Sequence, residues 1–344
     1  MRVLIVDDSA VVREILSQLL AQDRRISVAT SPDPVVAFEK IKRERPDVII
    51  TDLEMPRMDG LAFVRTVMRT DPIPIIVCSG AIGPGTERAL QALAEGAIEI
   101  ITKPKFGVRE FLHDSAQQLL QMVWEVAGSS LAHIKPRLSI PNRSQAIPYS
   151  PELRTKRPQL IAIGASTGGP EAIREILQEM PENCPGIVIV QHMPAAFTRA
   201  FADHLNRDCS IQVKEAEHGD RVLSGWALVA PGNRHLLIGR NAAYYEVEIN
   251  DEPPVGHHRP SIDLFFNSVA NAAGRQATGV LLTGMGRDGA AGLLEMRRAG
   301  STTIAQDETT SVVFGMPAEA IILGAAQQVL RLNQIAPAVL QRNR

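Results

Sequence analysis

Three carboxylates, a hydroxyl and an amine in the first part of the chain occur where short apolar runs end. They are Asp7, Asp8, Asp52, Ser79 and Lys103. In an open parallel sheet the carboxyl ends of the strands form the ligand-binding edge, so these residues are expected to converge although they lie far apart in sequence. Clustered carboxylates repel one another and favour a hard divalent cation, which predicts Mg²⁺ bound by Asp7, Asp8 and Asp52.

A carboxylate beside Mg²⁺ can act as a nucleophile toward phosphorus and form an aspartyl phosphate. The hydroxyl of Ser79 and the amine of Lys103 would then hold the phosphoryl oxygens. Any one of the acids could instead cap a helix or lie in a solvated loop. Because all five residues fall at matching strand ends, the pattern favours a phosphoryl-transfer site.

A serine in a glycine-rich turn is the main chemical signal of the second half. The segment GASTG, from Gly164 to Gly168, follows an apolar run and has the spacing of a nucleophile elbow around Ser166. Small residues allow the sharp turn that exposes such a hydroxyl near the start of a helix. The same turn could cradle a phosphate or dinucleotide, although the order G-x-G-x-x-G is absent. It could also be a tight turn with Ser166 as a helix cap.

A serine nucleophile needs a general base, and the base needs an orienting carboxylate. Of the eight histidines, His192 directly follows a buried-looking apolar run. Asp288 ends a glycine-rich loop at the expected start of a helix. These residues give the chain order Ser…His…Asp. The order Ser…Asp…His of ordinary α/β-hydrolases would instead recruit His257 or His258 with an earlier acid such as Asp220.

Apolar runs alternate with amphipathic stretches through the first half of the chain, which predicts a parallel sheet with helices on both faces. The expected strands are Val3–Val6, Ile26–Ala29, Val48–Thr51, Ile75–Ser79 and Ile98–Thr102. Helical patterns lie between them, for example at Ala10–Gln22 and Pro34–Glu44.

The same alternation returns in the second half and predicts a doubly wound, mostly parallel α/β domain. The expected strands are Leu160–Gly164, Ile187–Gln191, Ala227–Ala230 and Val280–Thr283. Two further runs, Leu236–Ile238 and Tyr244–Glu248, flank Gly239 and Asn241. This pattern predicts an antiparallel hairpin inserted in the second domain.

The composition narrows the class of protein. A length of 344 residues argues for two domains, and Lys plus Arg (36) nearly balances Asp plus Glu (38). Without a basic excess, and with 4% aromatic residues, nucleic-acid binding is not expected. No apolar run is long enough for membrane insertion. Three widely spaced cysteines suit a reducing cytoplasm.

A proline-rich basic segment separates the two halves. Residues 128–158 contain five prolines, and six basic residues against one acid give the segment a charge of +5. Such sequence predicts a semi-extended linker, with a docking segment for an acidic partner as the alternative. We therefore expect domains at 1–125 and 158–344, joined by a basic linker at 126–157.

The first half resembles the response-regulator receiver domain. The motifs are VLIVDDS (3–9), IITDLEMPRMDG (49–60), VCSG (77–80) and TKP (102–104). The resemblance covers about 125 residues and implies a flavodoxin-like five-stranded parallel sheet. It also implies Asp52 as phosphoacceptor, Mg²⁺ held by Asp7 or Asp8 with Asp52, Ser79 as switch hydroxyl and Lys103 as phosphate partner. Ile100 departs from the family, which usually has an aromatic switch residue there.

The second half is similar to the chemotaxis protein-glutamate methylesterase family, CheB, over about residues 158–330. The motifs are IGASTGGPEAI (163–173), VQHMPAAFTRAFA (190–202), VAPGNRHL (229–236), HRPSIDLFFNSVA (258–270), LLTGMGRDGAAGL (281–293) and VVFGMPAEAI (312–321). The resemblance implies Ser166 as nucleophile, His192 as general base and then acid, and Asp288 as orienting acid. It places Thr167 in the same turn and makes the backbone N–H of Met285 an oxyanion-hole candidate.

The two resemblances together imply a phosphorylation-regulated hydrolase of sensory adaptation in chemotaxis. It would demethylate γ-glutamyl methyl esters and deamidate glutamines on methyl-accepting chemotaxis proteins, with a chemotaxis histidine kinase as phosphodonor. The esterase reaction itself is expected to need no cofactor, and we expect a monomer. The alternative is a receiver-controlled receptor-binding module with a vestigial esterase site, which would not turn over a generic ester.

Overall fold

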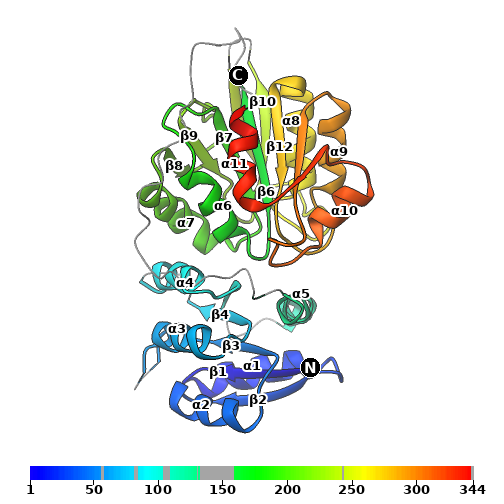
Figure 1. Cartoon of the computed structure of the whole chain (residues 1–344). Helices are drawn as coiled ribbons and strands as arrows, with labels where there is room; N and C mark the ends of the chain where they lie inside the picture. Colours follow the sequence, from blue (N-terminus) through cyan, green and yellow to red (C-terminus); the bar gives the residue numbers. More distant parts are fainter. Residues whose placement is uncertain are drawn as a thin grey trace. The chain divides into compact units, whose positions relative to one another are not determined.

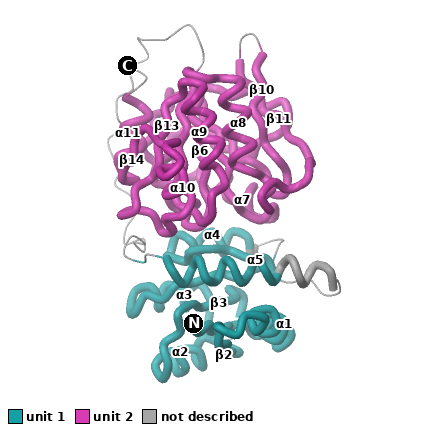
Figure 2. The backbone as a smooth tube through the Cα atoms, turned by 90° about the vertical axis from the view of Figure 1, so that its right-hand side faces the viewer, with its two compact units in different colours: residues 1–140 teal, residues 141–344 magenta. Residues whose placement is uncertain are grey.

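The computed structural model describes residues 1–55, 58–80, 84–103, 109–129, 131, 159–241 and 244–341. The chain divides into two compact units, Met1–Ile140 and Pro141–Arg344 (Figure 2). Most of the expected linker, at 130 and 132–158, lies outside the described residues, and the domain limits 1–125, 126–157 and 158–344 stay predictions. The last helix of the first unit, α5 (Arg109–Ala127), continues two residues past 125.

The first unit contains the predicted five-stranded parallel sheet (Figure 1). Its strands are β1 (Arg2–Val6), β2 (Ser27–Ser31), β3 (Val48–Thr51), β4 (Ile75–Ser79) and β5 (Glu99–Thr102), in the order β2-β1-β3-β4-β5. Its helices before α5 are α1 (Ala10–Leu20), α2 (Pro34–Arg43), α3 (Gly60–Thr70) and α4 (Pro84–Ala94). Three of them begin directly after a side chain that accepts a helix N–H: Ser9, Asp33 and Asp59.

The strand order determines where the first unit binds ligands. Strand β1 lies between β2 and β3, so the chain leaves β1 toward one side of the sheet and later continues on the other side. Right-handed crossovers then place α1 on one face and α2, α3 and α4 on the opposite face. A switch of this kind opens a crevice at the carboxyl ends of β1 and β3, where Asp7 and Asp52 follow their strands.

The second unit has a seven-stranded sheet that is parallel throughout, in the order β14-β13-β12-β6-β7-β9-β8. Its strands are β6 (Leu160–Ala165), β7 (Gly186–Gln191), β8 (Gln212–Glu215), β9 (Trp226–Val229), β12 (Ala277–Leu281), β13 (Thr302–Gln306) and β14 (Gln328–Leu330). The strand expected at Val280–Thr283 corresponds to β12, which begins earlier, at Ala277, and ends at Leu281. Thr283 lies past the strand. Its N–H donates to Gln306 Oε1 at the end of β13, and its hydroxyl donates to the carbonyl of Thr167 in the turn after β6.

The predicted hairpin is confirmed as β10 (His235–Arg240) paired antiparallel with β11 (Tyr245–Asn250). The helices of the unit are α6 (Gly169–Gln178), α7 (Ala195–Asp208), α8 (Ile262–Ala273), α9 (Ala290–Arg298), α10 (Met316–Ile322) and α11 (Leu332–Gln341), with the 3₁₀ turn η3 (Gly274–Gln276) after α8. The chain leaves β6 toward β7 but later extends from β12 toward β14, so the crevice of this sheet opens at β6.

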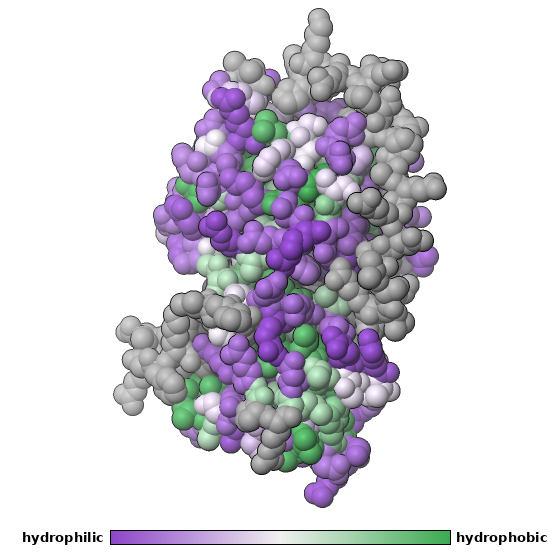
Figure 3. Space-filling model, turned by 90° about the vertical axis from the view of Figure 1, so that its left-hand side faces the viewer, coloured by the Kyte–Doolittle hydropathy of each residue, from purple (hydrophilic) through white to green (hydrophobic). Residues whose placement is uncertain are grey.

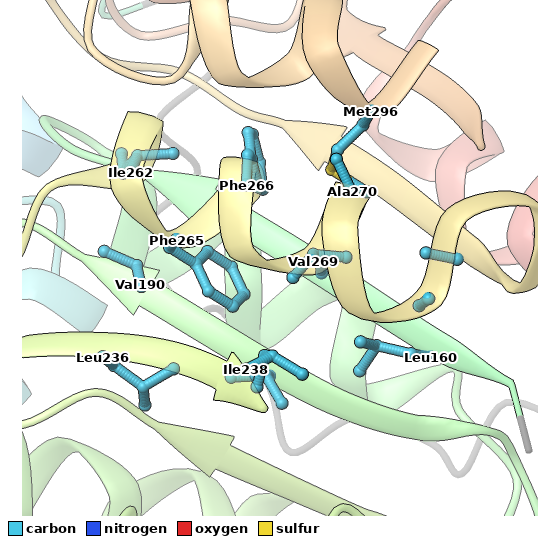
Figure 4. Packing of buried hydrophobic residues seen from close by; sticks show 14 of the residues in the cluster. Leu160, Val190, Leu236, Ile238, Ile262, Phe265, Phe266, Val269, Ala270 and Met296 are labelled. Atoms are coloured by element: carbon cyan, nitrogen blue, oxygen red, sulfur yellow. The ribbon is translucent and has the colours of Figure 1, made fainter. Parts of the chain in front are cut away.

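Helix α8 is the centre of the core of the second unit. Its apolar residues recur every three or four positions, which gives the helix one continuous buried stripe. In Figure 4, Phe265 and Val269 of this stripe lie among Val190 of β7 and Leu236 and Ile238 of β10. This packing holds the first turn of α8 at the carboxyl edge of the sheet, beside β6 and β7.

None of the described helices combines the length and the apolar character needed to cross a membrane. Among the described residues of the second unit that are visible in Figure 3, most are hydrophilic.

Candidate active site

Ser166 lies in the turn between β6 and α6, at the carboxyl edge of the sheet. Its backbone N–H donates to the carbonyl of Thr283 at 3.0 Å, which ties the turn to the loop after β12. Its carbonyl accepts from the N–H of Gly169 at 2.7 Å and so closes the turn. The sequence predicted this strand–turn–helix arrangement, and the half-buried side chain of Ser166 is directed toward the next strand.

His192 directly follows β7, the neighbour of β6. Its backbone N–H donates to the carbonyl of Ala165 at 3.0 Å. Its Nδ1 lies 3.3 Å from Ser166 Oγ, and its Nε2 lies 2.9 Å from Asp288 Oδ2. A neutral ring that donates from Nε2 to Asp288 leaves Nδ1 free to accept the hydroxyl proton of Ser166. The structure therefore brings together the three residues in the order Ser…His…Asp.

Asp288 is held by the first turn of α8. Its Oδ1 accepts from Ser261 Oγ and the N–H of Asp263, both at 3.0 Å, and its Oδ2 accepts from the N–H of Ile262 at 2.8 Å. Burial by itself would raise the pKa of Asp288. The hydrogen bond and charge of His192, together with the backbone N–H groups, outweigh burial and lower the pKa to about 2. The carboxylate is thus ionised and fixed in position to orient the imidazole.

The loop after β12 packs directly against the nucleophile. A Cβ on Gly284 would lie 2.7 Å from Ser166 Cβ, so only a glycine allows this approach. The carbonyl of Gly284 accepts from the N–H of Met316 at 2.7 Å, which fixes the peptide that precedes Met285. Thr167 is buried, and its carbonyl accepts from Thr283 Oγ1 at 2.9 Å. The Met285 peptide therefore lies beside Ser166, while its role as an oxyanion donor stays a prediction.

A second imidazole, which the sequence offered only as a base in the alternative order, lies against the first. His258 stacks on His192 with ring centroids 4.0 Å apart and planes 4° from parallel. Burial, and then the neighbouring His192, lowers the pKa of His258 to about 4, so this ring is neutral near pH 7. No spacing in the sequence could have indicated this contact, because the loop that carries His258 reaches the site only through the tertiary fold.

The alternative order Ser…Asp…His is not formed. Asp220 accepts from Lys214 Nζ at 2.9 Å and from the N–H of Glu217 at 2.7 Å, which engages it in a separate turn. His257 is exposed and has a φ of 72°. His258 contacts the ring of His192 rather than replacing it at Ser166.

The acidic cluster of the first unit forms as predicted in space. One carboxylate oxygen from each of Asp7, Asp8 and Asp52 lies within 4.8 Å of the other two. Lys103 Nζ lies 2.7 Å from Asp52 Oδ2 and 3.4 Å from Asp7 Oδ2. Ser79 is buried at the end of β4, and its carbonyl accepts from the N–H of Lys103 at 2.9 Å. All five residues thus meet at one edge of the sheet.

The electrostatics of this cluster fit a divalent cation. Burial raises the pKa of Asp7, and the charge of Asp52 adds to the rise while Lys103 opposes it. Asp7 Oδ2 is buried, and its contact with a cation is the 3.4 Å ion pair with Lys103 Nζ. A buried carboxylate oxygen next to two further carboxylates is the donor set that Mg²⁺ prefers. Ile100, which the resemblance places where an aromatic switch residue is expected, is buried in β5 and is 1% exposed.

Comparisons with known proteins agree with this architecture. The family model described as "CheB methylesterase" matches residues 161–339, and that of the "Response regulator receiver domain" matches residues 3–113. A protein-glutamate methylesterase/protein-glutamine glutaminase of Anaeromyxobacter dehalogenans is 52% identical over 98% of each chain. The protein of that name from Escherichia coli K12 is 50% identical over 99% of this chain and 96% of its own.

A solved structure resembles the second unit. It is the CheB methylesterase catalytic domain of Thermotoga maritima, with a TM-score of 0.53 and 35% sequence identity. The match covers 54% of this chain and 98% of the solved one.

Proposed function

This chain belongs to the CheB methylesterase family, and on that premise we propose that it demethylates and deamidates chemoreceptors under the control of its receiver domain. Its substrates are the γ-glutamyl methyl esters and glutamines of methyl-accepting chemotaxis proteins, and the reaction takes place in the cytoplasm. The observation that carries the proposal is the chain of contacts from Ser166 Oγ through His192 to Asp288, at 3.3 and 2.9 Å.

Hydrolysis follows from the roles that these positions allow. Ser166 Oγ attacks the ester carbonyl while His192 Nδ1 takes the hydroxyl proton, and the protonated ring then gives that proton to the departing methoxide to release methanol. Water then attacks the acyl-enzyme while His192 takes one of its protons. The bond to Ser166 Oγ breaks, the ring returns the proton to Oγ, and glutamate is released. The N–H of Met285 would stabilise the oxyanion, a contribution worth about 10²–10³ in rate. With a glutamine substrate the leaving group is ammonia.

Phosphorylation of the receiver site at Asp52 controls this hydrolytic activity. Asp52 accepts the phosphoryl group from a chemotaxis histidine kinase, while Lys103 and Ser79 hold the phosphoryl oxygens. Mg²⁺ held by Asp7, Asp8 and Asp52 would offset the negative charge that phosphorylation adds to the cluster.

Methanol release tests the function directly. The full chain is incubated with a methylated chemoreceptor, with and without a small phosphodonor and Mg²⁺, and methanol is measured over time. We expect release in both cases and faster release with the phosphodonor. Binding of the receptor without release of methanol, and without turnover of a generic ester, would favour the binding-module alternative.

The Asp52→Asn variant is expected to lose activation by the phosphodonor and to keep basal hydrolysis, since an amide cannot form the acyl phosphate and Ser166 belongs to the other unit. Methanol release with and without the phosphodonor checks this. Asp71→Asn, which changes an exposed acid paired with Arg45, should keep full activation. Activation that survived in Asp52→Asn would contradict the phosphoacceptor assignment.

A further inference from the structure

Gln191 connects the backbones of the nucleophile and the base. It is the last residue of β7 and is 1% exposed. Its Nε2 lies 2.9 Å from the carbonyl oxygen of Ser166 and 2.9 Å from the carbonyl oxygen of His192. One amide group thus donates both of its protons to the two loops whose separation sets the geometry of catalysis.

The neighbouring carbonyls determine the orientation of this amide. If Oε1 and Nε2 exchanged places, Oε1 would face two carbonyl oxygens, and all three groups can only accept hydrogen bonds. In the observed orientation Oε1 is buried without a hydrogen-bond partner among the described residues. The cost of the unpaired Oε1 is therefore offset by the two hydrogen bonds that Nε2 donates to the carbonyls of Ser166 and His192.

The glycine at the start of α6 provides the space for Gln191. A Cβ on Gly169 would lie 2.1 Å from Gln191 Oε1, so no larger residue fits beside the amide. The N–H of Gly169 donates to the carbonyl of Ser166, the same carbonyl that accepts from Gln191. The Ser166 peptide is consequently held from both sides, by the helix that follows it and by the adjacent strand.

We propose that Gln191 is a positioning residue for hydrolysis, which sets the separation of Ser166 Oγ and His192 Nδ1 by anchoring the backbones that carry them. Its side chain touches neither reacting atom, so it acts through these two residues. The contact it controls is 3.3 Å long, and general-base catalysis requires hydrogen-bond reach. This inference rests on the proposed hydrolase function.

Two substitutions test the proposal in the full chain. Gln191→Met keeps the length of the side chain but removes both donors, so we expect kcat to fall by about 10²-fold, as for a small misplacement of reacting groups, with KM nearly unchanged. Gln191→Glu should lower kcat further near pH 7, because a carboxylate would face two carbonyl oxygens. Gln212→Glu, an exposed glutamine on β8, should leave both constants unchanged.

The measurement is methanol release at several receptor concentrations, with kcat expressed per folded molecule from urea unfolding curves. A merely structural role would leave kcat per folded molecule at the wild-type value and would overturn the proposal. An increase in KM at constant kcat would also overturn it, because Gln191 would then act on substrate binding. If Gln191→Met does not fold, kcat per folded molecule and KM of Gln191→Glu test the proposal in the same way. Failure of the wild-type chain to release methanol is a different result and would refute the proposed function.

Discussion

The Ser166→Ala variant is expected to release no measurable methanol from a methylated chemoreceptor, with kcat lowered by roughly 10⁶-fold. The reason is that Ser166 Oγ is the proposed nucleophile. It is the hydroxyl that lies 3.3 Å from His192 Nδ1, whereas Thr167, the other hydroxyl of the turn, is buried. The hydroxyl contacts Nδ1 of His192, at the long end of hydrogen-bond range, so its removal should cost the fold little. Loss of activity should therefore occur in a chain that unfolds at the wild-type urea concentration.

Phosphorylation provides an internal control for this variant. The cluster of Asp7, Asp8 and Asp52, which contains the proposed phosphoacceptor, belongs to the other unit, so Ser166→Ala should still take up phosphate from a small phosphodonor. Ser224→Ala removes a hydroxyl that donates to the carbonyl of Cys184, remote in sequence from the triad, and should release methanol like the wild type. Methanol release by Ser166→Ala near the wild-type rate would refute the triad.

The Asp288→Asn variant is expected to lose about 10⁴ in kcat, the usual cost of replacing the orienting acid of a triad by its amide. Four donors point at the carboxylate: Ser261 Oγ, the N–H groups of Ile262 and Asp263, and the imidazole of His192. An asparagine has one accepting oxygen, so its NH₂ must face a backbone N–H of α8. If the NH₂ takes the place of Oδ2, it also forces His192 into the tautomer with its proton toward Ser166.

Asp263→Asn is the matched control for Asp288→Asn, because it makes the same chemical change at the junction of α8 and α9. Asp263 Oδ1 accepts from the N–H groups of Gly289 and Gly292, and one amide oxygen can keep both bonds. We therefore expect a much smaller loss of kcat in methanol release. If both variants lost kcat equally, the loss would come from disturbing the junction of α8 and α9, and the contact of Asp288 with His192 would not explain it.

The ionisation of Asp288 also predicts how the stability of the second unit changes with pH. Folding lowers the pKa of this carboxyl from 3.8 to about 2, so its charged form stabilises the folded state above about pH 4. That contribution is lost as the pH falls toward 2. The Asp288→Asn variant should lack this part of the acid-induced decrease in the free energy of unfolding, which urea titrations at several pH values would detect.

The sequence alone was enough to predict the first sheet, four of the seven strands of the second sheet, and residues at the carboxyl edges of both. Strands buried on both faces appear as continuous apolar runs, and parallel strands bring their carboxyl ends to one edge, so Asp52, Ser166 and His192 could each be assigned to a strand end. The strands β8, β13 and β14 were missed. Two of them are short edge strands with exposed residues, and β13 buries Thr303 and Gln306, whose polar groups are paired by hydrogen bonds rather than excluded from the core.

The sequence predicted Asp288 as the acid beside His192, but only the tertiary structure shows how their contact forms and what else surrounds His192. Asp288 and His192 are 96 positions apart, and their contact depends on the first turn of α8, which its buried stripe holds at the edge of the sheet. The stacking of His258 and the two hydrogen bonds donated by Gln191 follow from the same packing. Apolar periodicity records which residues are buried and in which kind of element, because burial is a property of each position. It does not record how two distant loops cross, because that depends on the relative placement of elements that are not neighbours in the chain.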